Sequence, residues 1–361
     1  MRFSIFSLLK TVFVLVVLAA LGVGGYVLYS RLPSVLDELS PRPGVSRPAP
    51  GKEVIVTIPK GASLTKVGAI LDENGVISSR LVFKIVAMIR GETRKIQAGE
   101  YALKTGSDPG EVLDLLISGK TLMFPFTIPE GYTIFQMADL FQQWGLMSRD
   151  EFLTLANDKA FLKDLAIEAD SLEGYLFPDT YFLQASEKGD GKLLIRRMTK
   201  RFFEVYDKHV RPTAEKYDWN TNQVLTLASL VEKEARESEH GLVSAVFHNR
   251  LRKGMRLQCD PTVIYRIKPM GSKITREDLE RNHPYNTYVN PGLPPGPIAS
   301  PGKASLIAAV KPSDKDYLYF VSKNDGTHQF STTLEEHNKW VNFYQRQPRN
   351  RTELQAQPPV R

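Results

Sequence analysis

The sequence contains only one cysteine, Cys259, among its 361 residues. One cysteine excludes an intramolecular disulfide and a zinc site built from cysteines. The six histidines are scattered, with no pair four residues apart, which argues against a metalloenzyme, so no metal or other cofactor is expected. Low-complexity repeats are also missing, although the chain has 23 prolines and 25 glycines. Collagenous and wholly disordered classes are therefore excluded, and most of the chain must fold.

Acidic residues are fewer than basic ones, with 40 Asp and Glu against 47 Lys and Arg, and the formal net charge is +7. This excess suits a partner that carries carboxylates or phosphates, but it does not choose between them. The hydrophobic share of 42% is typical of a folded protein. A chain of this length fits two or three packed units.

An uncharged run occupies residues 11–29 and consists mainly of Val, Leu, Ala and Gly. At about 1.5 Å per residue it is long enough to span a bilayer core, so we predict one transmembrane helix. Basic residues and no acidic ones precede the run, which predicts that residues 1–10 are cytoplasmic and that the rest of the chain lies outside. A cleaved signal peptide is the alternative, because Ala20 and Gly22 could form a cleavage site, but the run is longer than a usual signal sequence.

The composition on either side of the folded part predicts two extended segments. Residues 30–52 are rich in proline, with Ser, Arg and Gly between, and such a composition predicts a stalk without a core. Residues 346–361 form a basic tail that we predict to be disordered. Between them we predict a smaller domain over residues 53–150 and a larger one over residues 151–345.

The smaller domain contains an internal duplication. Residues 56–78, VTIPKGASLTKVGAILDENGVIS, align without a gap with residues 126–148, FTIPEGYTIFQMADLFQQWGLMS. Each copy predicts a strand, a turn at Pro-x-Gly and an amphipathic helix that ends before Gly75 or Gly145. This plan is similar to the LysM modules that bind amino-sugar glycans. The alternative is a structural duplication that only supports the next domain.

The segment between the two copies supports the same fold class. Residues 96–103 predict a strand, and residues 109–117 predict a short helix that Asp108 opens. We therefore predict an α+β subdomain, followed by a mixed α+β larger domain.

The strongest helical pattern covers residues 220–235, NTNQVLTLASLVEKEA, with Asn220 as N-cap and Gln223 in the capping-box position. Glu232 and Glu234 project about 160° apart from this helix, so they cannot act as one pair. Bulkier apolar neighbours surround Glu234, and they should raise its pKa towards the value that a general acid needs. The alternative is that both are ordinary boundary residues of an amphipathic helix.

Three further segments carry polar and aromatic groups. Residues 243–267 predict a helix through Leu251, a turn at Gly254 and then a β-rich run. Residues 285–302 predict an ordered loop, and residues 171–183 mix carboxylates with aromatic rings as sugar-binding sites do. The candidate binding residues in these segments are Glu173, Tyr175, Asp179, Arg256, Gln258, Asp260, Tyr285 and Asn286. The alternative for each of them is structural support.

The motifs SLEGYLFPDTY, LASLVEKEA, NRLRKGMRLQCDPTVIY and YNTYVNPGLPPGPIASPG follow one another in the chain. Their order resembles the endolytic murein transglycosylase family, known as MltG or YceG-like proteins, from the uncharged run to about Val341. The resemblance implies an inner-membrane protein with a LysM-like subdomain and a catalytic domain in the periplasm. One departure is Cys259, where the family pattern has threonine, and this argues against an essential role for that side chain.

The resemblance also implies the reaction. The bond between N-acetylmuramic acid and N-acetylglucosamine breaks without water inside a glycan strand, and a 1,6-anhydro end remains. One acid suffices for this reaction, because the group that protonates the leaving oxygen can then accept the proton of the 6-hydroxyl. We assign that role to Glu234, with Glu232 in reserve. The resemblance further implies work beside peptidoglycan synthases that ends the growth of nascent strands.

Two alternative functions stay open. A peptidoglycan hydrolase of the lysozyme type would need a second carboxylate, which Asp179, Glu173 or Asp260 could supply. A non-catalytic scaffold would bind nascent glycan through the duplicated units and recruit synthases. A nucleic-acid partner is excluded, because the predicted location of the folded part is outside the cytoplasm.

Overall fold

The computed structural model describes residues 51–184 and 187–346. The predicted membrane helix, its cytoplasmic tail, and nearly all of the predicted stalk and basic tail lie outside the described residues. In the part of the chain that is described, no helix has the length and apolar character needed to cross a bilayer.

The chain divides into two compact units. Among the described residues, the first unit contains residues 51–124 and 184, and the second contains residues 125–183 and 187–346. This boundary differs from the one expected at residue 150. The reason is that the second copy of the duplication packs into the core of the second unit, where Phe126 and Ile134 are buried.

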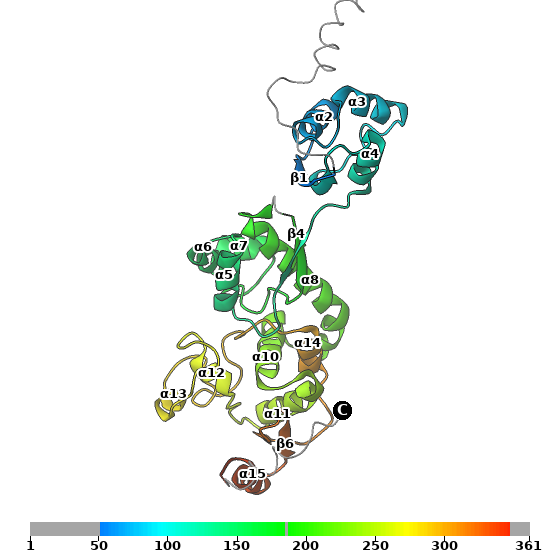
Figure 1. The fold of residues 1–361 in the computed structure, drawn as a ribbon. Helices are drawn as coiled ribbons and strands as arrows, with labels where there is room; N and C mark the ends of the chain where they lie inside the picture. Colours follow the sequence, from blue (N-terminus) through cyan, green and yellow to red (C-terminus); the bar gives the residue numbers. More distant parts are fainter. Residues whose placement is uncertain (1–50, 185–186, 347–361) are drawn as a thin grey trace, which may run out of the picture. The chain divides into compact units, whose positions relative to one another are not determined.

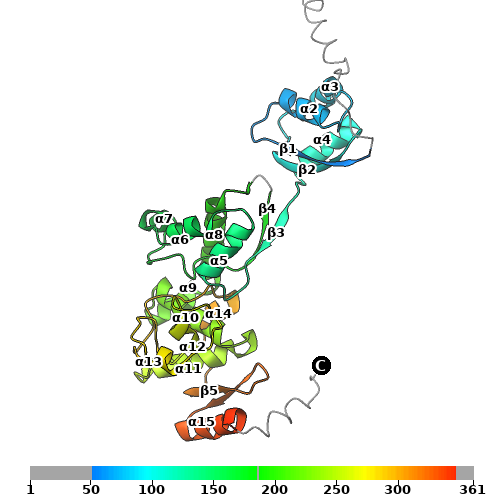
Figure 2. The same ribbon diagram turned by 60° about the vertical axis from the view of Figure 1, so that its left-hand side comes forward.

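The first unit has a two-stranded sheet, three helices and a core of its own (Figures 1 and 2). Its elements are β1 (Glu53–Ile58), α2 (Leu64–Glu73), α3 (Arg80–Ile89), β2 (Gly99–Lys104) and α4 (Pro109–Ser118). The strands are antiparallel, with Val56 opposite Tyr101. The predicted strand at residues 96–103 is confirmed as β2, and the predicted helix is confirmed as α4, in which Asp108 accepts a hydrogen bond from Gly110 N at 2.8 Å.

The second unit is mainly helical. Its elements are β3 (Phe124–Thr127), α5 (Ile134–Gln143), α6 (Arg149–Ala156), α7 (Lys159–Asp164), β4 (Thr180–Leu183), α8 (Gly191–His209), α9 (Arg211–Ala214), α10 (Thr221–Glu234), α11 (His240–Arg252), α12 (Asp260–Ile264), α13 (Arg276–Glu280), α14 (Lys303–Val310), β5 (Tyr319–Ser322), β6 (His328–Ser331) and α15 (Leu334–Val341). Strand β3 pairs with β4, and β5 pairs with β6. The predicted α+β fold class is confirmed.

The duplication appears as the same strand-turn-helix sequence in both units. The first copy forms β1 and α2, and the second forms β3 and α5. Ser63 and Thr133 cap the two helices at equivalent positions. Gly75 and Gly145 follow the helices with φ of 70° and 66°, a left-handed conformation that glycine adopts without strain.

Helix α10 is enclosed by its neighbours, because all eight residues from 224 to 231 are buried. It packs against α14, α11 and α12, and Figures 1 and 2 both show α14 beside it. The predicted capping box is confirmed, with Asn220 accepting from Gln223 N at 2.9 Å. A helix that is apolar on every side occupies the centre of a domain, and only its ends reach polar surroundings.

The prediction of a β-rich run after Gly254 is wrong, because the chain forms the short helix α12 there. Pro261 stands in the first turn of this helix, where its fixed φ is favourable and its missing N–H costs nothing. The Thr262 hydroxyl donates to the Cys259 carbonyl at 2.6 Å and thereby closes the turn. A local proline signal therefore outweighs the β-propensity of the apolar residues that follow.

A substitution at Gly174 should destabilise the second unit. Its φ is +82°, and an added Cβ would lie 2.8 Å from Pro297 Cβ and 2.9 Å from Leu225 Cγ. We expect Gly174→Ala to lower the free energy of unfolding by about 2–4 kcal/mol through backbone strain and overpacking. Urea unfolding followed by tryptophan fluorescence reports this unit, because all three tryptophans lie in it.

Gly145→Ala is the matched control for this experiment. Its φ of +66° carries a similar backbone penalty, but an added Cβ would meet nothing within 4 Å. The control should cost only about 1 kcal/mol. Equal losses in both variants would contradict the packing argument.

Candidate active site

Glu234 is the last residue of α10, and its carboxylate points to the start of α12. It accepts hydrogen bonds from the Cys259 thiol and from the backbone N–H of Asp260. Burial raises the pKa of Glu234 to about 7, and the negative charge of Asp260 acts in the same direction, whereas the positive charge of Arg250 opposes it. The predicted rise of this pKa is confirmed, so a large fraction of Glu234 carries a proton at neutral pH.

A second carboxylate and a cation border Glu234. The exposed Asp260 accepts a hydrogen bond from Tyr288 Oη at 2.5 Å. Arg250 is held in place by donating to the carbonyls of Leu257 and Leu318, each at 2.7 Å. Glu234 therefore lies at the end of α10 among polar side chains that hydrogen bonds hold in place. We call this group of residues, Asp260, Tyr288 and Arg250, the Glu234 frame.

Cys259 connects this frame to the loop that follows α13. Its side chain is fully buried, and its backbone N–H donates to Thr287 Oγ1 at 2.9 Å. Burial and the charge of Glu234 hold the pKa of the thiol well above its usual value, so the thiol keeps its proton. A threonine hydroxyl, expected here from the resemblance, would be a donor of similar reach, so the exchange preserves a hydrogen-bond donor beside the acid.

Glu232 faces the opposite side of α10 and contacts the beginning of α14. Its carboxylate accepts from Gly302 N at 3.0 Å and from Ser305 Oγ at 2.6 Å. A negative charge there stabilises α14 through its unpaired N–H groups. Burial and the charge of Glu232 raise the pKa of the nearby Glu130, which comes from the Pro-x-Gly turn of the second copy. The two glutamates of α10 thus belong to separate sites.

Glu173 occupies a third place, at the beginning of α5, and its side chain is 1% exposed. Both of its oxygens lie near Ile134 N, at 3.1 and 3.2 Å, and Tyr265 Oη donates to it at 2.7 Å. Burial raises the pKa of Glu173 to about 7. Ile134 belongs to the second copy of the duplication, and Tyr265 follows directly after α12. Glu173 therefore connects these two segments in the interior of the second unit.

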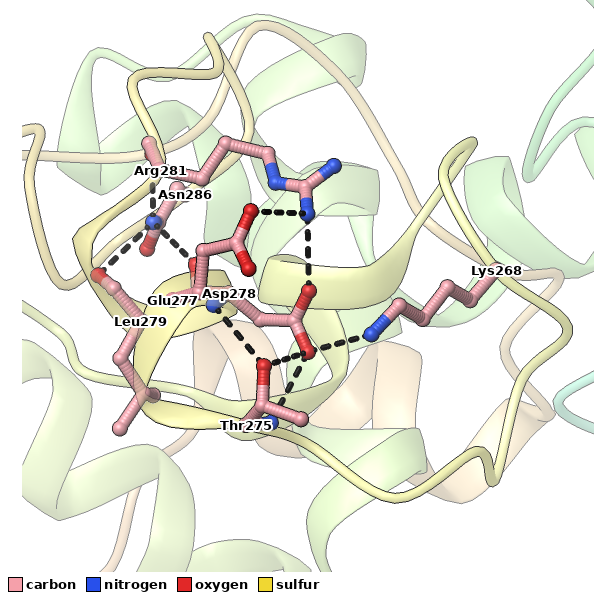
Figure 3. A network of polar contacts seen from close by, with 7 residues as sticks. All are labelled: Lys268, Thr275, Glu277, Asp278, Leu279, Arg281 and Asn286. Carbon is pink, nitrogen blue, oxygen red and sulfur yellow. Dashed lines mark hydrogen bonds and ion pairs between the residues drawn. The ribbon is translucent and has the colours of Figure 1, made fainter.

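Asn286 is buried and braces the loop that carries Tyr285 and Tyr288. Its side-chain amide donates to the carbonyls of Asp278, Leu279 and Arg281, and Figure 3 shows these contacts converging on one nitrogen. The Asp278 carboxylate accepts from Lys268 at 2.5 Å and from Thr275, which keeps the pKa of Asp278 below its usual value. This network positions the loop and uses the whole Asn286 amide within the protein.

The other predicted site residues fall into three groups. Gln258 joins the Glu234 frame, because its Oε1 lies 3.4 Å from an Arg250 nitrogen. Tyr285 packs on Tyr265, with ring centroids 4.7 Å apart, and so lies near Glu173. Further away, Tyr175 packs on Phe202 in the core, Asp179 pairs with Arg201 at 3.1 Å, and Arg256 is exposed with its carbonyl 3.4 Å from Arg250.

The roles of Arg250, Cys259 and Arg266 in these contacts were not predicted from the sequence. Arg250 is 7% exposed, and a buried arginine shows no periodic signal that separates it from a surface one. Arg266 stacks over Tyr265 at 5.5 Å in a left-handed conformation, with φ of 63°. The same guanidinium lies 5.9 Å from the centroid of the Tyr285 ring, and this contact joins segments that only the tertiary fold brings together.

A carboxyl group whose pKa is raised to about 7, next to a second carboxyl group, is the arrangement of a general acid that acts on an oxygen leaving group. No cluster of three or more possible metal ligands occurs among residues 51–184 and 187–346.

The comparisons with known proteins agree with this class of site. The YceG-like family model matches residues 56–342, and the chain belongs to this family. The endolytic murein transglycosylase of Bacillus subtilis is 35% identical over 304 residues, which are 79% of this chain and 83% of that protein. The protein of the same name from Streptococcus pneumoniae is 30% identical, and the match covers 91% of this chain but only 63% of that protein.

A solved structure is similar as well. The crystal structure of a YceG-like protein from Listeria monocytogenes has 35% sequence identity and a TM-score of 0.56. The match covers 80% of this chain and 98% of that chain.

The buried carboxyl of Glu173 should make stability depend on pH. Its pKa is about 7 in the folded protein against an ordinary value of 4.5, so the folded state binds more protons between these values and stability falls as pH rises. The loss for this group amounts to about 3.5 kcal/mol at most, at ~1.4 kcal/mol per pKa unit. Unfolding in urea at pH 5, 6, 7 and 8 should show a weaker pH dependence in Glu173→Gln than in the wild type.

Glu204→Gln is the control for this measurement, because Glu204 is an exposed residue of α8. An identical pH dependence in wild type and Glu173→Gln would contradict the raised pKa.

Proposed function

We propose that this chain is a membrane-anchored endolytic lytic transglycosylase that cuts peptidoglycan strands between N-acetylmuramic acid and N-acetylglucosamine. The family and the names of the relatives support the substrate and the class of reaction. The observation that carries the mechanism is the Glu234 carboxyl, which has a pKa of about 7 and stands at the surface end of an apolar helix.

In the proposed reaction Glu234 acts first as acid and then as base. Its proton passes to the glycosidic oxygen, and the bond to C1 of the muramic acid breaks. The carboxylate then accepts the proton of the 6-hydroxyl, whose oxygen bonds to C1 and closes the 1,6-anhydro ring. The hydrogen bonds from Cys259 and Asp260 N–H hold the carboxylate in one position during both steps.

The proposed location follows from the sequence. The uncharged run would hold the protein in the inner membrane with a single pass, the N-terminus in the cytoplasm and the catalytic domain in the periplasm. The first unit would act there as a LysM-like module on the glycan. Cleavage of strands during synthesis would end their elongation, which makes peptidoglycan synthases the expected partners.

A hydrolase of the lysozyme type is the second candidate, and the position of Asp260 favours it. This carboxylate is close enough to Glu234 to raise its pKa, whereas Asp179 and Glu173 are held by other partners. A second carboxylate beside the acid is what a retaining or inverting hydrolase needs. The products separate the two reactions.

Glu234→Gln should abolish cleavage of uncrosslinked glycan strands. The amide cannot donate a proton as an acid, so we expect a loss of at least about 100-fold in kcat. Mass spectrometry of wild-type products should show 1,6-anhydro ends. Ends that have gained water would instead establish the hydrolase, and intact strands would favour the non-catalytic scaffold.

Glu232→Gln is the control variant on the same helix. Glutamine keeps an oxygen that can accept from Gly302 N and Ser305 Oγ, so we expect activity to persist with a lower melting temperature. Cleavage that survives in Glu234→Gln but is lost in Glu232→Gln would reverse the assignment.

The pH dependence of kcat/KM should show the titration of Glu234. Because the reactive form is protonated, the rate should fall as pH rises through about 7, the pKa of Glu234. Initial rates between pH 5 and 9 on one strand preparation test this. A rate that stays constant to pH 9 would exclude Glu234 as the acid.

A further inference from the structure

The second unit contains a cavity of about 840 Å³ whose lining does not include Glu234. It lies between α7, the segment that precedes Glu173, the first turn of α10 and the proline-rich loops around residues 284 and 295–297. A cavity of this volume can hold a small ligand or a few amino-acid residues of a bound peptide. Nothing in the mechanism above uses it.

Among the described residues that line the cavity, one buried side-chain atom lacks a hydrogen-bond partner. Asn222 Oδ1 is buried, and the described residues offer it no hydrogen-bond donor, whereas its Nδ2 donates to Pro295 O at 3.3 Å. The Tyr285 hydroxyl lines the same cavity. Gly296 lies between them, since an added Cβ would be 3.4 Å from Tyr285 Oη and 3.9 Å from Asn222 Oδ1. A buried unpaired acceptor is costly, and a ligand N–H would satisfy it.

The aromatic geometry argues against a sugar ring as the occupant. Tyr285 already packs against Tyr265, and the Arg266 guanidinium lies 5.9 Å from its centroid. Sugar sites usually offer the open face of an aromatic ring, and here protein groups crowd this ring. What the cavity offers instead is the phenol, an amide oxygen and proline rings.

The charges of the cavity have both signs. Lys163 and Arg266 contribute positive charge, and Glu168 contributes negative charge. Lys159 and Asp170, also in the wall, form an ion pair with each other. A ligand that carries carboxylates and an amine together with amide N–H groups matches this lining.

We propose that this cavity binds the peptide stem of a muramic acid residue in the strand being cut. The inference rests on the proposed function, because it names a further part of the same substrate. Peptide stems carry amide N–H groups for Asn222 Oδ1, carboxylates for Lys163 and Arg266, and a free amine for Glu168. Strands without stems lack the amine and the peptide amides and carboxylates, and keep only the acetamido N–H groups and the lactyl carboxylates of the sugars.

The position of the cavity along α10 fits a single bound strand. Asn222 and Glu234 are twelve residues apart on this helix, which corresponds to about 18 Å. The loop that Asn286 braces carries Tyr285 into the cavity wall and Tyr288 to Asp260 beside the acid. The stem would therefore belong to a sugar some way along the strand from the bond that breaks.

The experiment compares two substrates with the full-length protein in detergent. One is uncrosslinked glycan strand with intact stems, and the other is the same preparation after an amidase has removed the stems. We expect KM to be about tenfold higher for the stripped strands, with kcat little changed. Equal KM values for the two substrates would overturn the proposal.

Two variants localise the effect. Gly296→Ala places a methyl group between Tyr285 Oη and Asn222 Oδ1 at ordinary contact distances, so it should fill the cavity wall without disturbing the fold. Lys163→Ala removes one cation. Both should raise KM several-fold for strands with stems and leave it unchanged for stripped strands. Lys208→Ala, an exposed change on α8, is the control and should alter neither value.

Binding measured without turnover distinguishes this inference from the proposed function. Fluorescence anisotropy of labelled strands should show tighter binding when stems are present, whether or not the strands are cut. A stem preference without cleavage would contradict the proposed function alone. Cleavage of both substrates with equal affinity would contradict the cavity assignment alone.

Discussion

The contact between the Glu232 carboxylate and the beginning of α14 is the interaction on which the rest of the site depends. It ties the last turn of α10 to Gly302 N and Ser305 Oγ. Because the middle of α10 is buried, this contact fixes the orientation of its last turn. Glu234 then faces α12. One glutamate thus stabilises the helix end, and the other is left available for chemistry.

The second copy of the duplication has a different use from the first. Its helix α5 begins on the carboxylate of Glu173, and its Pro-x-Gly turn places Glu130 beside Glu232 and the Gly131 carbonyl within 3.2 Å of Lys233 Nζ. The first copy packs into its own separate core. A repeat that is plain in the sequence has therefore been divided between two units, and the second copy contacts α10.

Much of the fold and part of the site could be predicted from the sequence, because local rules govern them. The capping box of α10 and the opposite directions of Glu232 and Glu234 follow from helix geometry alone. The partners of Glu234 could not be predicted, since Cys259 and Arg250 reach it only through tertiary packing. Asn286 was a candidate either for binding substrate or for structural support; its amide donates to three backbone carbonyls, and a single sequence does not separate these roles.

The thiol beside the acid has a consequence for chemical durability. Oxidants and alkylating reagents attack the thiolate and not the thiol. Burial and the neighbouring carboxylates disfavour the Cys259 thiolate, and the side chain has no exposed surface. The hydrogen bond between the Cys259 thiol and Glu234 is therefore protected from oxidative damage by the same desolvation that raises the pKa of Glu234.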